Sequence, residues 1–452
     1  MANNRLGNDG VARSCDCRRR PPQLGFRLDG REERAAALMQ DSVYVAGVGM
    51  TRFALLPGRT VKQLVREAVS ACLDDAGARA ADVEAAFFAN VGQGLLEGQT
   101  GTPGQMALRP LGFQAIPIVN VENACASGMT ALHLGMAQVR AGMADIVLAI
   151  GAEKLSVEDV AKRDALFAGG MDVHDRDAAM ARLAALGAGI SVPPAEGERS
   201  VFMDMYGCWA RAHMADFGTT RRQLAAIAAK NHGHSVDNPY CQFRRAFTVD
   251  EVLAARSLSY PLTVPMCSAY SDGAAAALLC SAEGLRRLGD AARAGAVRIA
   301  ASVLQTGSDR DDRDWDRHVT RLAADRAYDQ AGIGPDAIDL AEVHDATAFG
   351  ELLNVENLRL AARGEGGPAA ERGDFTLGGR VPVNVSGGLE SRGHPLAATG
   401  LAQVHELVTQ LRGRAGPRQV ARARHAMLEN GGGLYGVEDA AAAVAILAAP
   451  GA

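Results

Sequence analysis

Residues 116–142 read IPIVNVENACASGMTALHLGMAQVRAG, and this stretch decides the fold. IPIVNV is a short apolar run typical of a buried strand. The segment after it places apolar side chains on one helix face, at Met129, Leu132, Met136 and Val139. The run ADIVLAIGAEK at 144–154 then predicts a second buried strand. Strand, helix and strand in this order predict a βαβ unit, and hence a parallel sheet.

The same alternation continues on both sides of this unit. Upstream, VYVAGVG predicts a strand, VKQLVREAVSACLDDAG a helix, and VEAAFFANVGQG a strand that leads into a glycine-rich loop ending near residue 115. Downstream, SDGAAAALLCS predicts a strand that resumes the first sheet, and a second series of strands and helices follows from VRIAASVLQ to AAAAVAIL. Two halves with comparable elements predict an internal pseudo-repeat in an α/β fold.

The alternation of predicted strands and helices indicates where the chain divides into an extension and two halves. Residues 1–40 have no apolar period and contain Arg18, Arg19 and Arg20, so we expect a disordered N-terminal extension. Residues 41–290 form the first half, with an insertion at about 152–250 that we expect to lie over the catalytic face. Residues 291–452 form the second half.

Composition excludes several classes of protein. A net charge of -5 offers no basic surface for nucleic acid, and no apolar run is long enough to span a membrane. Eight irregularly spaced cysteines do not form a disulfide framework and suit a reducing cytoplasm, where we place the protein. The CDC triplet at 15–17 has no second cysteine pair, so we expect no metal site there or elsewhere.

Three reactive side chains fall at corners where a predicted strand gives way to a helix. Cys125 follows IPIVNV, and a helix N-terminus there would lower the pKa of its thiol. His344 ends IDLAEVH, and His394 precedes Pro395, a residue favoured in the first helical turn. A lone cysteine is often a small buried apolar residue, and a lone histidine a loop residue. Three such groups at one sheet edge instead predict a nucleophile with its proton acceptors.

A glycine run, ENGGGLYG at 429–436, lets the backbone approach closely and would present N–H groups to an oxyanion, although a turn explains it equally well.

With these motifs in place, the chain resembles the thiolase superfamily, and more closely its sterol-carrier and lipid-transfer branch. VENACASGMTALHLG, YPLTVPMCSAYSDGAAAALL, EVHDATAFGELL, NVSGGLESRGHPLAATGLAQ and LENGGGLYG match in family order, over roughly residues 41–448. The resemblance implies a thiolase fold of two βαβ-rich halves in five helix and sheet layers, an inserted loop domain, and a homodimer. It implies coenzyme A thioester substrates and no permanently bound cofactor.

Residue roles follow from the resemblance by position. Cys125 is similar to the acylated nucleophile, His394 to the residue that activates it, and His344 to the partner that shapes the thioester oxyanion site. Gly432 resembles part of a second oxyanion loop. Ser268 resembles a position that touches the pantetheine arm.

The chain departs from the family where a second cysteine acts as acid/base. The terminal loop has Glu429 and Asn430 in place of Cys-x-Gly, and Ala346 follows His344-Asp345 where the sterol-carrier branch has cysteine. His344, Glu429 or Tyr435 would then have to take the proton. A second thiol from the insertion or its edge is a further alternative, from Cys208, Cys241 or Cys267. For coenzyme A phosphates we propose His232, His234 and Arg244, although solvated loop charges explain these residues equally well.

Three functions remain open on the sequence. The first is an acyltransferase that thiolyses or condenses a 3-oxoacyl-CoA-like substrate through a Cys125 acyl-enzyme. The second is a retro-aldol lyase of a β-hydroxyacyl-CoA, working with a small OB-fold partner protein, which would account for the missing second cysteine. The third is a non-catalytic carrier or scaffold subunit.

Overall fold

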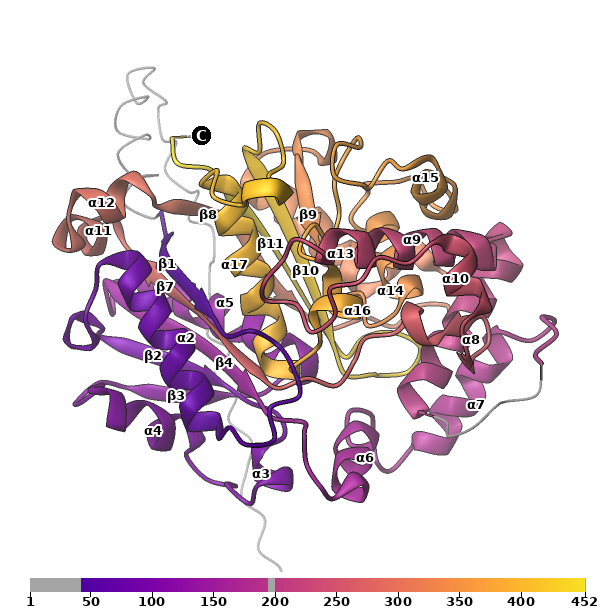
Figure 1. The fold of residues 1–452 in the computed structure, drawn as a ribbon, viewed down its shortest axis with the longest axis horizontal. Coiled ribbons are helices and arrows are strands. Elements are labelled where there is room, and N and C mark those ends of the chain that lie inside the picture. The colour runs from indigo at the N-terminus through magenta and orange to yellow at the C-terminus, as the bar shows by residue number, and fades with distance from the viewer. Residues whose placement is uncertain (1–41, 194–199, 452) are drawn as a thin grey trace, which may run out of the picture. The chain divides into compact units, whose positions relative to one another are not determined.

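The computed structural model describes residues 42–193 and 200–451. The predicted extension at residues 1–40 and the CDC triplet lie outside the described residues. All the described residues belong to one compact unit, shown in Figure 1. Its strands are β1 Tyr44–Met50, β2 Ala85–Ala89, β3 Ile118–Val121, β4 Ile146–Glu153, β5 Ser257–Ser259, β6 Leu262–Thr263, β7 Gly273–Cys280, β8 Val297–Gln305, β9 Leu340–Glu342, β10 His425–Gly432 and β11 Ala441–Ala448.

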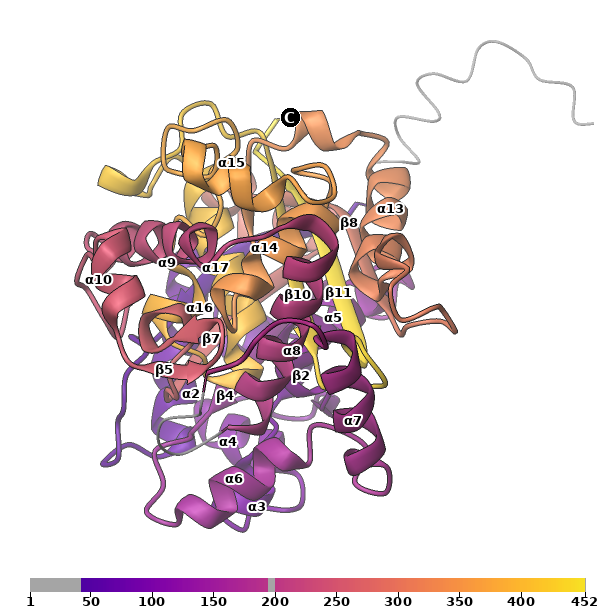
Figure 2. The ribbon, with the colours of Figure 1, turned by 90° about the vertical axis from the view of Figure 1, so that its right-hand side faces the viewer.

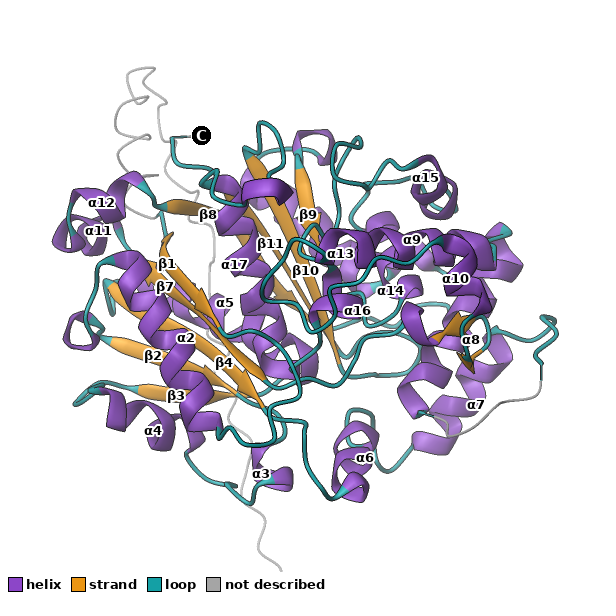
Figure 3. Cartoon of the chain, viewed as in Figure 1, coloured by secondary structure: helices purple, strands orange, loops and turns teal. Residues whose placement is uncertain are grey.

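Helices, purple in Figure 3, lie between many of these strands, singly or in series. They are α2 Val61–Ala76, α3 Gln93–Leu96, α4 Pro103–Leu108, α5 Ser127–Arg140, α6 Val160–Ala168, α7 Arg176–Leu186, α8 Val201–Phe217, α9 Arg221–Ser235, α10 Val249–Ala254, α11 Ala282–Leu288, α12 Asp290–Ala294, α13 Val319–Ala331, α14 Ala348–Asn357, α15 Gly366–Arg372, α16 Gly388–Arg392 and α17 Thr399–Leu411. Within the described ranges, no helix combines the length and apolar character needed to cross a bilayer.

Nine strands of the described residues join in one sheet, in the order β3-β2-β4-β7-β1-β8-β11-β10-β9. The predicted βαβ unit is confirmed, because β3, β2 and β4 are parallel. The sheet as a whole is mixed, since β7 returns from the insertion antiparallel to both β4 and β1. The two halves of the sheet meet where β1 pairs with β8, over only two residue pairs.

The two halves have the same strand order. In the second half β9 and β10 are parallel, and β11 is antiparallel to both β10 and β8. Val383 adds a parallel bridge to Ala341 on the outer side of β9, where the first half has β3 beside β2. In each half, three parallel positions are followed by one antiparallel strand, β7 or β11, and then by a strand that runs in the first direction again, β1 or β8. This shared order is the predicted pseudo-repeat.

Five layers result from how the helices cover the two halves of the sheet. One apolar cluster joins α2 and α4 to the outer face of the first half. A second joins both halves of the sheet to α5 and α17, which form the central layer. A third covers the outer face of the second half with α13 and α14. The buried face predicted for α5 is confirmed, because Met129, Leu132, Met136 and Val139 are all buried in the central cluster.

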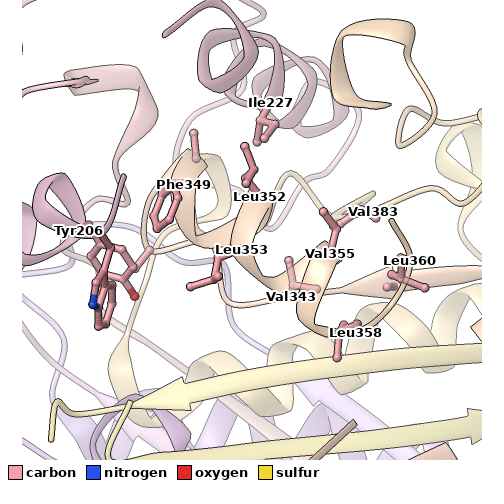
Figure 4. Close-up of a cluster of buried hydrophobic side chains, with 14 of the residues drawn as sticks. Tyr206, Ile227, Val343, Phe349, Leu352, Leu353, Val355, Leu358, Leu360 and Val383 are labelled. Atoms are coloured by element: carbon pink, nitrogen blue, oxygen red, sulfur yellow. The ribbon is translucent and has the colours of Figure 1, made fainter. Parts of the chain in front are cut away.

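The insertion is mostly helical. It contains α6 to α10, which spread in Figure 2 from α10 on the left to α7 on the right, and the small β5-β6 sheet follows it. Tyr206 from α8, Ile227 from α9 and Phe349 from α14 belong to one buried cluster, which also holds Val343 immediately before His344 (Figure 4). The insertion is thus anchored to the second half. The loop predicted to run to residue 115 differs from the prediction, since it contains the short helices α3 and α4.

Candidate active site

Cys125 lies in the turn between β3 and α5, within the 3-10 helix Ala124–Ala126. The turn is held by side chains at both ends. Ala124 N donates to the Glu122 carboxylate over 2.6 Å, and Asn123 N donates to Ser127 Oγ over 2.8 Å. Ala124 has a φ of 48°, a conformation that non-glycine residues adopt rarely and often at functional sites. The turn leaves Cys125 half-buried on the wall of a pocket.

His394 reaches this thiol from the second half of the chain. Its Nε2 lies 3.2 Å from Cys125 Sγ, and its Nδ1 lies 2.7 Å from Thr399 Oγ1. The Thr399 hydroxyl itself donates to the Pro395 carbonyl over 3.0 Å, so it accepts from Nδ1–H. This arrangement assigns the proton to Nδ1 and leaves the Nε2 lone pair directed at the thiol.

His344 completes the group at the end of β9. Its Nε2 lies 3.4 Å from His394 Nε2, and its backbone N–H donates to the Glu429 carboxylate over 3.0 Å. The Asp345 carboxylate accepts from Leu389 N over 2.7 Å, which ties the His344 loop to α16 just before His394. Both histidine loops are therefore fixed by buried hydrogen bonds.

Close backbone packing sets the position of His394 against Cys125. The 3-10 helix Leu396–Ala398 follows His394 and packs on β4 and α5. A methyl group placed on Gly128 would lie 2.5 Å from the Ala397 carbonyl oxygen, and one on Gly151 would overlap the same atom. Glycine at these two positions allows the loop to approach.

The protonation states differ from the sequence prediction for Cys125. Burial, with a contribution from the Asp439 carboxylate, raises the pKa of the Cys125 thiol to about 12. The predicted lowering by the helix N-terminus was wrong, because apolar walls and nearby carboxylates outweigh it and α5 begins only at Ser127. Burial also lowers the pKa of His394 well below its usual value and that of His344 to about 4. The resting pair is therefore a neutral thiol and a neutral imidazole.

The pocket beside Cys125 is largely apolar and has a volume of about 240 Å³. Its walls come from the insertion and from both halves of the sheet. Its larger apolar and aromatic lining residues are Leu166, Phe167, Phe202, Met203, Met205, Tyr206, Leu258, Tyr270 and Leu396. The insertion thus lies over the pocket that Cys125 lines.

The glycine run lies beside Cys125, but only part of it faces the pocket. Gly432 and Gly433 line the pocket, and a methyl group on Gly432 would lie 2.8 Å from Ala126 N. Glu429 and Asn430 are fully buried in β10 outside the pocket lining. The side chain of Tyr435 is 73% exposed and lines a neighbouring open hollow.

The predicted coenzyme A contacts separate into three cases. Ser268 lines the pocket, and its backbone N–H donates to the Ala346 carbonyl over 2.9 Å. His232 is buried away from it, with its nitrogens 3.0 Å from Pro265 O and 2.9 Å from Ser391 Oγ, so its predicted contact with coenzyme A is wrong. Arg244 is exposed and donates to the Val236 carbonyl, and its phosphate contact stays a prediction.

His234 also has both ring nitrogens in hydrogen bonds within the protein. Its Nδ1 lies 3.0 Å from Asn384 O, and its Nε2 accepts from Leu377 N over 3.1 Å. These bonds leave no ring nitrogen for a coenzyme A phosphate.

Of the three alternative thiols, only Cys267 lines the pocket. Cys241 is buried and its Sγ lies 3.1 Å from the Ser386 carbonyl, and the sulfur of Cys208 contacts Arg211.

Sequence reasoning missed several polar residues of this pocket, among them Asp439 and Tyr206. Asp439 follows the glycine run in the loop before β11, and Tyr206 lies in α8 among apolar neighbours. The signal in the sequence that could have identified Asp439 is its position shortly after the ENGGG motif.

The three reactive side chains could also hold a metal ion, because their sulfur and nitrogen atoms lie within 4.8 Å of one another. A thiolate with two imidazoles is a donor set suited to Zn²⁺. An ion there would occupy the sulfur of Cys125.

Comparison with known proteins identifies the family. The family model for the thiolase N-terminal domain matches residues 43–252, and that for the thiolase C-terminal domain-like region matches residues 301–448. Sterol carrier protein 2 of Oryctolagus cuniculus is 39% identical over 397 residues, covering 86% of this chain and 69% of that protein. Acetyl-CoA acetyltransferase of Methanothermobacter thermautotrophicus is 39% identical over 398 residues, covering 87% and 97%.

A solved structure titled Ltp2-ChsH2(DUF35) aldolase aligns with a TM-score of 0.73 at 22% identity, over 91% of this chain and 99% of that one. At this identity the likeness shows the fold alone. The family models span most of the described chain, and both relatives cover more than four fifths of it. These matches confirm the resemblance seen in the sequence, and the chain therefore belongs to the thiolase family of acyltransferases.

Proposed function

We propose that the protein transfers acyl groups from coenzyme A thioesters through an acyl-enzyme on Cys125. The observation that carries this proposal is the 3.2 Å contact between Cys125 Sγ and His394 Nε2, with the Nδ1 proton held by Thr399. A neutral imidazole in this tautomer takes the thiol proton as the sulfur attacks, which is how a thiol of high pKa becomes a nucleophile.

The developing oxyanion needs hydrogen-bond donors on the same wall. The backbone N–H of Cys125 and the Gly432 loop are adjacent there, since Gly432 packs against the nucleophile turn. The imidazole of His344, whose Nε2 lies 3.4 Å from His394 Nε2, is a further candidate donor. Removing one such donor typically lowers kcat by about 10²–10³-fold.

The volume and the lining of the pocket limit which acyl groups can bind. At about 240 Å³ the pocket is smaller than the range of roughly 300–1,000 Å³ typical of sites that enclose drug-sized ligands. It can therefore take an acyl chain, while the pantetheine arm and nucleotide of the thioester lie outside. Its aromatic and aliphatic walls favour a bulky apolar acyl group over a polar one.

The proposal is tested by incubating the protein with 3-oxooctanoyl-CoA and free coenzyme A and separating the products. We expect hexanoyl-CoA and acetyl-CoA, and no products from the Cys125→Ala variant. Full activity in that variant would exclude an acyl-enzyme on Cys125.

A retro-aldol lyase is the second candidate, because Ala346 replaces the second catalytic cysteine in the sterol-carrier pattern. The solved structure titled as an aldolase, with ChsH2(DUF35) as its second component, shares this fold. Aldol cleavage needs no acyl-enzyme, so release of a ketone or aldehyde by Cys125→Ala, with an OB-fold partner present, would favour it. Stoichiometric binding without turnover would favour the carrier function.

We further propose that the protein forms a homodimer through β3. This strand ends the sheet among the described residues, and its Val119 is 43% exposed. An edge strand with an exposed apolar side chain is suited to pairing with another chain. Light scattering of the purified protein should give twice the mass of the chain, and a monomeric mass would contradict the proposal.

A further inference from the structure

Making or breaking a carbon–carbon bond next to a thioester requires a group that moves a proton at the α-carbon. Three of the predicted substitutes for the second cysteine, His344, Glu429 and Tyr435, do not meet this need. Glu429 lies outside the pocket lining, and Tyr435 is largely exposed and lines the neighbouring open hollow instead of the pocket. Burial lowers the pKa of His344 to about 4, so at neutral pH it is a weak base and holds no imidazolium proton to give.

Asp439 is placed where such a group is needed. It lies in the loop between β10 and β11 and lines the same pocket as Cys125 and His344. Its carboxyl group packs on the glycine run, since a methyl group on Gly431 would lie 2.7 Å from its Cγ and Oδ1. The carboxyl group thus fills the side-chain space that Gly431 leaves open.

The electrostatic surroundings of Asp439 also fit an acid/base residue. The carboxylate is close enough to Cys125 and Tyr206 to raise the pKa of both groups. No hydrogen bond between its carboxyl group and another described residue is seen. Burial and the neighbouring Glu438 raise the pKa of Asp439 to about 7, so both its protonated and ionised forms are populated at neutral pH.

We infer that Asp439 is the acid/base residue of the carbon–carbon step, giving a proton to the α-carbon in cleavage and taking one in condensation. This inference rests on the proposed function, because it assigns a residue to the second partner of the Cys125 reaction.

The step balances with coenzyme A as the only co-reactant. His394 holds the thiol proton while Cys125 Sγ bonds to C3 of the 3-oxoacyl thioester. Collapse of the adduct breaks the C2–C3 bond, and C2 keeps the electron pair and takes the proton of Asp439. The thiol of free coenzyme A then gives its proton to the Asp439 carboxylate, and its sulfur bonds to the acyl carbon. Cys125 leaves as thiolate and recovers its proton from His394.

The test measures the proposed nucleophile, Cys125, and the proposed acid/base residue, Asp439, in two separate reactions. Acylation of Cys125 by 4-nitrophenyl hexanoate, followed by intact-protein mass spectrometry, needs no proton donor because the leaving group is a stable anion. Exchange of the α-hydrogens of octanoyl-CoA in D₂O needs the acid/base residue. We expect Asp439→Asn to acylate at least as fast as the wild type, because it removes a carboxylate that raises the pKa of the Cys125 thiol, and to lose α-exchange by about 10²–10⁴-fold, the usual contribution of a general acid/base. Asp439→Glu should recover part of the exchange.

Control variants sharpen the result. Asp172→Asn removes a carboxylate from the neighbouring open hollow and should change neither rate. Exchange by Asp439→Asn within threefold of wild type would overturn the inference, as would loss of exchange in Cys267→Ala alone. Absence of exchange in wild-type protein that acylates normally would overturn it as well. Failure of the wild-type protein to acylate Cys125 would instead reject the proposed function.

Discussion

The two halves of this chain repeat one arrangement of strands but supply different chemistry. In the first half, the corner between β3 and α5 carries Cys125, which is half-buried on the pocket wall. In the second half, the segment between Val383, which pairs with β9, and α17 carries His394, which is buried and hydrogen-bonded. The helices that follow these two corners pack together in the central layer.

This comparison teaches how a fold of two similar halves brings a thiol and an imidazole into contact. Because α5 and α17 share one layer, the two corners face each other and bring Sγ to 3.2 Å from Nε2. The corners differ in what they must do. The first corner leaves a thiol open to substrate, whereas the second fixes an imidazole with buried hydrogen bonds.

The largest effect is expected when the imidazole of His394 is removed from the corner in the second half. We expect His394→Ala to slow acylation of Cys125 by about 10²–10⁴-fold, because the neutral thiol then has no proton acceptor. Acylation by 4-nitrophenyl hexanoate, followed by intact mass, measures this rate directly. An unchanged rate would show that the two corners do not act as a pair.

The pH dependence of alkylation distinguishes a neutral pair from an ion pair. Because the pKa of the Cys125 thiol is raised to about 12, its thiolate fraction should grow about tenfold per pH unit between pH 6 and 9. The rate of iodoacetamide labelling at Cys125 should rise with it. A thiolate–imidazolium pair would instead give a rate that is flat over this range.

Removing the group that orients the imidazole should have a smaller effect. Thr399→Val deletes the hydroxyl that accepts from His394 Nδ1 and keeps the shape of the side chain. We expect about a 10–100-fold loss of acylation rate, as for other supporting hydrogen bonds. The midpoint of thermal unfolding should be the same in the variant and the wild type, which serves as the control for folding. A wild-type acylation rate would show that Thr399 does not set the tautomer.

Close packing between the corners can be tested through stability. Gly151→Ala places a methyl group against the Ala397 carbonyl, so we expect a loss of about 1–3 kcal/mol in the free energy of unfolding, typical of overpacking. Urea denaturation measures it. Gly233→Ala in α9 is the matched control, because nothing lies near the added methyl group and helix propensity predicts a gain of about 0.5–1 kcal/mol. Equal effects would contradict this explanation.

Much of this arrangement could be predicted from the sequence. The apolar face of α5 and the strand runs on either side specify the βαβ unit, because burial periodicity is local information. Cys125, His344 and His394 were found because each ends a strand or opens a helix, and such corners gather at one edge of a sheet.

The rest depends on long-range packing. Asp439 reaches the pocket only because the chain reverses between β10 and β11 and the side-chain space at Gly431 is open. The raised pKa of Cys125 arises from apolar walls supplied by the insertion, which has no sequence period that places it. His232 looked like a phosphate ligand because its charge was visible in the sequence, whereas its burial was not.

The most direct test of the central claim is the intact mass of the protein after mixing with hexanoyl-CoA, beside the Cys125→Ala variant. The paired corners predict a mass increase equal to one hexanoyl group in the wild-type protein and none in the variant. An equal increase in both proteins, or none in the wild type with any acyl or 3-oxoacyl thioester, would contradict an acyl-enzyme on Cys125.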